Sequence, residues 1–243
     1  MIIERIKRKI KPNMYITPQT TPIVYFGNYE KAKACTISLN PSDREFLGKD
    51  GKLLMGKDAR LYSRVDFSKL DNEELTDSDA IRVKESCEKY FDKNPFTAWF
   101  DLFAIPLKKY WNYSYYDGTC ISLNLVQWAT AQKFDINNNI WNDHINNDLP
   151  TLIYLLKKEF EVIFLNGQSV VDILSASLNI KLINKPISCK DTRGNDKGLI
   201  GYFGYHNNAK VIGWNLFYPT SFKTDNKDDL INRNNFWEAI NKM

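Results

Sequence analysis

The sequence is poor in the residues that build metal clusters and disulfide frameworks. Its 243 residues include two histidines and four cysteines. The cysteines are far apart in the chain, so their spacing predicts no disulfide framework, no zinc site and no iron–sulfur cluster. Unpaired cysteines are typical of a reducing compartment. The sequence therefore predicts a cytoplasmic protein without a metal or another cofactor.

Long apolar runs and glycine-rich fingerprints are absent as well. Residues 1–11 are basic but lack a long apolar core, so we do not expect a signal peptide. No run approaches the roughly 20 apolar residues that a membrane-spanning helix needs. The glycine patterns that cradle nucleotide phosphates are missing, which disfavours nucleotide-binding enzymes of those types.

The overall charge is mild. The chain has 33 basic and 29 acidic residues, a net charge of +4, which permits a nucleic-acid partner without requiring one. Apolar residues make up 43% of the chain, enough for one well-buried core. No break in composition marks a second domain, so we expect a single domain over residues 1–243, present as a monomer.

Buried strands are predicted where short apolar runs are rich in β-forming residues and end in polar turns. These runs are residues 34–39, 120–126, 161–165 and 210–214. Residues 199–205 are expected to pair with the last run as a hairpin. Helical patterns lie between the strands, at residues 78–91, 96–110, 141–160, 167–178 and 228–243. This alternation predicts a three-layer α/β/α sandwich around a mainly parallel, four-stranded sheet.

Two prolines and one polar stretch modify this pattern. Pro106 is expected to break the helix at 96–110, and Pro150 to begin a second segment within 141–160. The stretch from about 43 to 79 reads as a polar insertion with little core-forming sequence.

Chemistry is expected beyond the carboxyl ends of the strands, where ligands of such folds bind. The first strand is followed by Asn40, which Pro41 holds in an extended backbone. The second strand carries Asn124 within an apolar run. One side-chain amide both donates and accepts hydrogen bonds, as does the edge of a pyrimidine. The structural alternatives are a simple Asn-Pro-Ser turn and an amide that holds a neighbouring loop.

The other two strand ends are less specific. Asn166-Gly167-Gln168-Ser169 is more typical of a tight turn with a helix cap than of an anion site. Residues 214–223 combine aromatics, hydroxyls and a lysine, which suit stacking on bases, contacts to phosphates and insertion into a duplex. The alternative is an aromatic cluster beneath the last helix.

Three of these segments, in this order, resemble motifs of the uracil-DNA glycosylase superfamily. They are Ser38-Leu39-Asn40-Pro41-Ser42, Ile121-Ser122-Leu123-Asn124 and Tyr218-Pro219-Thr220-Ser221-Phe222. Ser38 stands where a glycine is usual, and Tyr218 where a histidine or asparagine is usual. The resemblance implies a divergent DNA glycosylase that acts on a damaged or modified base. Some relatives act on hypermodified bases of phage DNA, and the polar insertion could accommodate such a base.

The resemblance also implies roles for individual residues. Asn40 would position the attacking water, with Asp43 as a possible proton acceptor or else a turn cap. Asn124 would read the flipped base, Phe46 or Tyr25 would stack on it, and Tyr218 would bond the leaving base. Phe222 would fill the gap in the duplex. The remaining residues expected to contact DNA are Ser42, Arg44, Arg193, Ser221 and Lys223.

Three other interpretations remain open. A nucleoside hydrolase on a similar sheet would share the strand-end loops but would not need the basic loops. A DNA-binding module without catalysis would treat Ser38 and Tyr218 as marks of a decayed site. A plain interaction scaffold would use the aromatics only as core.

Overall fold

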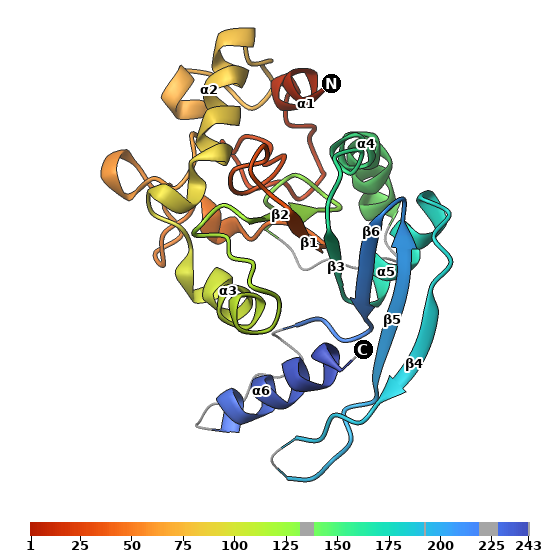
Figure 1. Ribbon diagram of the computed structural model, residues 1–243. Coiled ribbons are helices and arrows are strands. Elements are labelled where there is room, and N and C mark those ends of the chain that lie inside the picture. The colour runs from red at the N-terminus through yellow and green to blue at the C-terminus, as the bar shows by residue number, and fades with distance from the viewer. Residues whose placement is uncertain (132–138, 192, 219–227, 243) are drawn as a thin grey trace.

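A six-stranded sheet forms the centre of the molecule, with the strand order β2-β1-β3-β6-β5-β4 (Figure 1). The computed structural model describes residues 1–131, 139–191, 193–218 and 228–242. The strands are β1 (Ala34–Ser38), β2 (Cys120–Asn124), β3 (Val162–Asn166), β4 (Ile183–Ile187), β5 (Leu199–His206) and β6 (Ala209–Trp214). The four strands predicted from the apolar runs form the parallel part. The α/β class is confirmed, but the expected count of four strands is wrong.

The extra strands come from the hairpin side of the sheet. The predicted β5–β6 hairpin is confirmed, and Asn207 in its turn has φ 52°, a left-handed conformation that asparagine tolerates. β4 then pairs with β5 as an antiparallel edge. Its sequence contains Lys185 and Pro186 and is mostly exposed. Such residues are usual on edge strands but give no apolar signal, so the sequence did not reveal β4.

Helices cover both faces of the sheet, as the sandwich prediction requires (Figure 1). Two successive residues at the end of β6 point to opposite faces of the sheet and contact different helices. Trp214 contacts Trp237 of the last helix, with ring centroids 5.4 Å apart. Gly213 points the other way, where an added Cβ would lie 2.9 Å from Val171. The helices are α1 (Ile2–Lys7), α2 (Asp77–Glu88), α3 (Thr97–Trp111), α4 (Asn139–Leu155), α5 (Gln168–Ser177) and α6 (Asp228–Asn241).

Both proline predictions are wrong, because α3 and α4 run through their prolines. A proline within a helix frees the carbonyl four residues before it. For Pro106 that carbonyl belongs to Leu102, and it accepts a hydrogen bond from the hydroxyl of Tyr218 at 3.0 Å. Pro150 lies on the exposed side of α4, where water can satisfy the freed carbonyl. Tertiary contacts and solvent therefore make these prolines acceptable.

The polar stretch at 43–79 contributes more to the core than its composition indicates. Phe46, Leu61 and Leu75 are all buried in the main hydrophobic cluster. Arg64 is also fully buried, and its guanidinium donates to the carbonyl oxygens of Arg8, Leu70 and Glu73. The expectation of little core-forming sequence is wrong, because one buried cation gathers this stretch around backbone carbonyls.

Candidate functional site

The carboxyl edge of the parallel strands is held together by the side chain of Asn166, the last residue of β3. Its amide nitrogen donates to Ser38 Oγ at 3.2 Å and to the Tyr218 carbonyl at 2.9 Å. Its amide oxygen accepts from Trp214 Nε1 at 2.8 Å and from the Tyr218 backbone N–H at 2.9 Å. One buried amide thus joins the ends of three strands to the loop after β6.

The segment that begins with Asn166 predicted only a tight turn with a helix cap, not this set of hydrogen bonds. The available signal was an asparagine at the end of an apolar strand, the same signal that drew attention to Asn124. Ser38, which occupies the usual glycine position of the motif, supplies one of the partners of Asn166. Ser38 and Asn166 therefore hold the ends of β1 and β3 together.

Asn40 lies just beyond β1 with its side chain held in a defined orientation. Backbone pairing between the first two strands continues past their ends, because Leu125 N–H donates to the Ser38 carbonyl and Val126 N–H to the Leu39 carbonyl. The amide nitrogen of Asn40 donates to Thr130 Oγ1 at 2.9 Å and to the Pro41 carbonyl at 3.0 Å. Within the described part of the chain, its amide oxygen accepts no hydrogen bond. That oxygen is therefore the end presented to a ligand or a water.

Asn124 ends β2 and lies opposite Ser38 in the strand register. Its side chain is 4% exposed, and it makes no hydrogen bond to any residue in the ranges that the structure describes. Neither its amide nitrogen nor its amide oxygen is among the fully buried polar atoms that lack a hydrogen bond, so both keep some contact with solvent. The amide can therefore bond a water or a ligand at this edge. The structure does not show Asn124 holding a neighbouring loop, which was its structural alternative.

The turn after Asn40 is organised by its own side chains. Ser42 Oγ accepts from the Arg44 backbone N–H and donates to the Asp43 carboxylate, each at 3.2 Å, so Ser42 caps a short 3₁₀ helix, η1 (Asp43–Glu45). The guanidinium of Arg44 donates to the Gly48 carbonyl at 2.7 Å. Ser42 is exposed, and Asp43 and Arg44 are partly exposed. All three can still meet a bound molecule at this edge.

The two tyrosines predicted to contact the base are both buried in the core, away from the carboxyl edge. Tyr218 is 1% exposed, stacks on Phe236 and donates its hydroxyl to the Leu102 carbonyl. It belongs to an aromatic cluster beneath α6, and we withdraw its role as donor to a leaving base. Tyr25 is fully buried and donates its hydroxyl to Glu88 of α2 at 3.0 Å, and burial raises its pKa. It is not free to stack on a base.

The other predicted residues divide into two groups. Phe46 is 2% exposed in the main core, and its role as the stacking ring remains a prediction. Arg193 is exposed in the loop between β4 and β5. Because β5 runs antiparallel to β6, that loop lies at the same edge as Asn40 and Asn124. Ser221, Phe222 and Lys223 lie outside the described residues.

A buried carboxyl behind the Asn40 turn escaped the sequence analysis. Glu45 is 2% exposed and accepts a hydrogen bond from the hydroxyl of Tyr90. That hydroxyl in turn accepts from the backbone N–H of Phe96 at 2.8 Å, before α3. Burial raises the pKa of Glu45 to about 7, although the Tyr90 hydrogen bond and nearby Arg60 oppose the rise. A lone glutamate in a polar stretch gives no sequence signal for this connection.

The described residues were also compared with the requirements of a metal site and of a membrane-spanning helix. Among those residues, no group of three or more His, Cys, Asp or Glu side chains could hold a metal ion. All four cysteines are buried free thiols. No described helix combines the length and hydropathy needed to cross a membrane. Neither a family model nor a curated protein matches the sequence.

The structural role of Tyr218 makes a testable prediction. Tyr218→Phe leaves the Leu102 carbonyl without its donor, so the free energy of unfolding should fall by about 1–2 kcal/mol. Chemical denaturation measures this loss. Any activity of the carboxyl edge should stay within a few-fold of wild type in the folded variant. A folded, equally stable Phe variant with no activity would restore the tyrosine to the site.

Glu45 should make the stability depend on pH. Its folded pKa of about 7 lies above the ordinary 4.5, so the folded state favours the protonated carboxyl. Its contribution is fully present below about pH 4.5 and is lost as pH rises through about 7. Relative to Glu45→Gln, the wild type should lose on the order of 2–3 kcal/mol between pH 4.5 and 8. Urea unfolding of both proteins at several pH values tests this; parallel profiles would contradict it.

Proposed function

We propose that this protein is a DNA glycosylase that removes a damaged or modified base and leaves an abasic site. The observation that carries the proposal is the pair of amides at adjacent strand ends. Asn124 is buried without a partner among the described residues, and Asn40 beside it has a free amide oxygen in that same part of the chain. This pair matches the base-reading and water-positioning asparagines that the sequence motifs imply.

Asn124 suits the recognition of an extruded base. An enzyme that acts on a base inside a duplex must flip the nucleotide out of the stack and read its polar edge. The amide of Asn124 can donate one hydrogen bond and accept another from adjacent atoms of that edge. Because its polar atoms have no described protein partner, they can bond the base without breaking a hydrogen bond within the described part of the chain.

Asn40 suits the placement of the attacking water. Its amide nitrogen is held by Thr130 and Pro41, so its oxygen can accept a hydrogen from a water and fix that water's direction. An amide does not take up a proton near neutral pH, so Asn40 orients the water without deprotonating it. Stabilisation of the leaving base would then supply most of the rate enhancement. Asp43, the partly exposed carboxylate in the following turn, is our candidate to accept the proton.

The DNA strand would run along the carboxyl edge. Ser42 and Arg44 flank Asn40 there, and Arg193 lies in the β4–β5 loop at the same edge. The motif residues Ser221, Phe222 and Lys223 follow β6 in sequence and complete the proposed contacts. These groups would bind phosphates and fill the gap that the flipped base leaves in the duplex, while Asn124 reads the base and Asn40 places the water.

The direct test treats a panel of DNAs with the protein and then with alkali, which cleaves at abasic sites. The panel contains uracil, mismatches, deaminated purines, modified cytosines and bulky hypermodified pyrimidines, in duplex and single-stranded form. Strand cleavage for one class supports the proposal and identifies the base. Salt-dependent DNA binding without cleavage would favour a binding module, and release of base from free nucleosides would favour a nucleoside hydrolase.

Asn40→Ala should separate catalysis from binding. Without the oriented water, base release should fall by about 100-fold or more, while DNA affinity changes less than about threefold. Single-turnover kinetics and fluorescence anisotropy measure the two quantities. Asn146→Ala, at an exposed position of α4, is the matched control and should change neither. Equal losses of release and affinity in Asn40→Ala would remove its catalytic role.

Asn124→Leu should separate recognition from structure. Because the amide has no described protein partner, replacing it with an apolar side chain of similar size should cost less than about 0.5 kcal/mol of stability, or increase stability. Base release should nevertheless fall by about 100-fold or more, because the base loses its hydrogen bonds. Thermal unfolding and base release are measured on the same sample. A large loss of stability would show that the amide supports the fold instead.

A further inference from the structure

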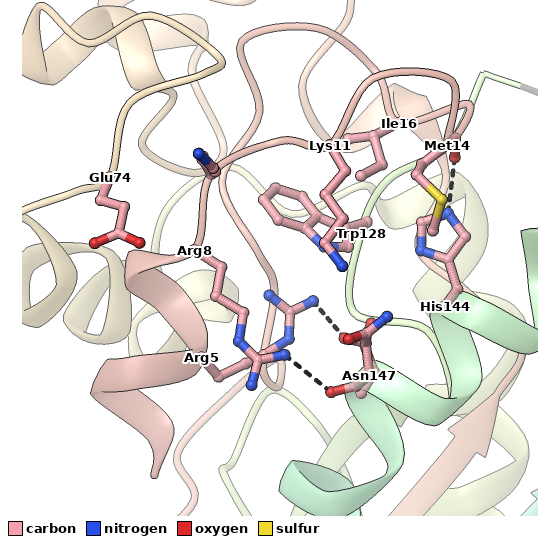
Figure 2. Close-up of a pocket in the computed structure, with 11 residues that line it drawn as sticks. Arg5, Arg8, Lys11, Met14, Ile16, Glu74, Trp128, His144 and Asn147 are labelled. Atoms are coloured by element: carbon pink, nitrogen blue, oxygen red, sulfur yellow. Dashed lines mark hydrogen bonds and ion pairs between the residues drawn. The ribbon is translucent and has the colours of Figure 1, made fainter.

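A cavity away from the asparagine pair lies between the N-terminal arm, the loop after β2 and α4 (Figure 2). Its volume is about 180 Å³. That exceeds the roughly 150 Å³ of an engineered cavity that holds a benzene ring, so a compact polar group with its neighbouring atoms can enter. Because the residues that line it come from four separate segments, Glu74 among them, only the folded chain creates it.

One wall of this cavity is rich in positive charge. Arg5, Arg8, Lys9 and Lys11 line it, against the two carboxylates of Glu74 and Asp148. The guanidinium of Arg8 donates to the Asn147 carbonyl at 3.1 Å, and Glu74 stands apart on the far side of Arg8 (Figure 2). Four cationic side chains against two carboxylates leave the lining with a net positive charge, which favours an anion.

Arg5 carries unused donors into this wall. Its side chain is 1% exposed, and its Nη2 lies 2.7 Å from the carboxylate of Asp148, an ion pair without hydrogen-bond geometry. Its Nε and Nη1 are buried and have no hydrogen-bond partner in the described part of the chain. Arginine presents five N–H donors that fit the oxygens of phosphates. Asp148 already balances the charge of Arg5, so the cationic groups that a ligand in the cavity can reach are the exposed Arg8, Lys9 and Lys11.

Apolar side chains also line the cavity. They are Trp128, Met14 and Ile16, and the ring of Trp128 packs against the guanidinium of Arg5, with its centroid 5.0 Å from the guanidinium carbon. His144 also lines the cavity and bonds the Met14 carbonyl through Nε2 at 2.7 Å. Burial lowers the pKa of His144, so its ring is neutral at neutral pH and adds no charge. Cationic groups beside apolar side chains suit a phosphate joined to a sugar.

We propose that this cavity binds a terminal phosphate ester of a nucleic-acid strand. A chain end can place its phosphate in a cavity of this size beside Arg8 and Lys11, whereas an internal phosphodiester carries bulky sugars on both sides. The choice of nucleic acid rests on the proposed function. The loop after β2 supports it, because Trp128 lines the cavity and Thr130, two residues on, holds Asn40.

The test compares phosphate sources on the full chain. Isothermal titration measures binding of inorganic phosphate and of a short oligonucleotide that carries either a 5′-phosphate, a 3′-phosphate or hydroxyls at both ends. We expect one phosphorylated end to bind about tenfold or more tightly than the hydroxyl form. Equal affinities of all three oligonucleotides would overturn the proposal. Binding of inorganic phosphate without any preference among the oligonucleotides would overturn the nucleic-acid source.

The variants remove exposed charges, because Arg5 is buried and its replacement could unfold the protein. Arg8→Gln with Lys11→Gln should abolish the preference for the phosphorylated end, a loss of about tenfold. Lys31→Gln with Lys157→Gln removes the same charge from exposed positions before β1 and after α4, at the opposite edge of the sheet. That control should keep the preference. If both pairs lose it equally, only general charge acts, and the cavity is not the site.

This experiment can fail separately from the glycosylase proposal. A phosphate preference that depends on Arg8 and Lys11 in a protein that releases no base would support the cavity and remove the proposed function. Base release by a protein without any phosphate preference would support the function and remove the cavity.

Discussion

The carboxyl edge of the sheet depends on one buried amide. Asn166 uses both ends of its side chain to join Ser38, Trp214 and the backbone of Tyr218, so three strand ends and the loop after β6 share one connection. A buried amide is stable only when its donors and acceptors are satisfied together. The hydrogen bonds of Asn166 hold Ser38 in place. Ser38 lies opposite Asn124, whose side chain makes no hydrogen bond to another described residue.

The same contrast distinguishes scaffold from candidate site elsewhere. Tyr218 and Tyr25 have buried hydroxyls that are bonded to a carbonyl and a carboxylate, and they stabilise the fold. The amide of Asn124 makes no hydrogen bond in the described ranges, and the guanidinium nitrogens Nε and Nη1 of Arg5 are buried there without a hydrogen-bond partner. Polar groups of the second kind favour ligands at both places. The loop after β2 lies between the two and contributes to each.

Much of the fold could be predicted because strand and helix patterns are local. The apolar runs at β1, β2, β3 and β6 marked the parallel strands, and alternation with helices marked the layers. The edge strand β4 was missed because an exposed edge needs polar residues and proline. The breaks expected in α3 and α4 were wrong because a tyrosine hydroxyl and solvent satisfy what the prolines release.

The sequence by itself determined which residue types stand at the strand ends, and hence that Asn40 and Asn124 lie at one edge. Only the tertiary structure decided which polar groups are satisfied. Asn40 and Asn124 kept free amide atoms within the described chain, whereas Tyr218 was drawn into the core by the carbonyl that Pro106 frees. The basic cavity likewise joins α1, α4 and the loop after β2. Hydrogen bonds between residues far apart in the sequence depend on how the elements pack, and no local sequence pattern predicts them.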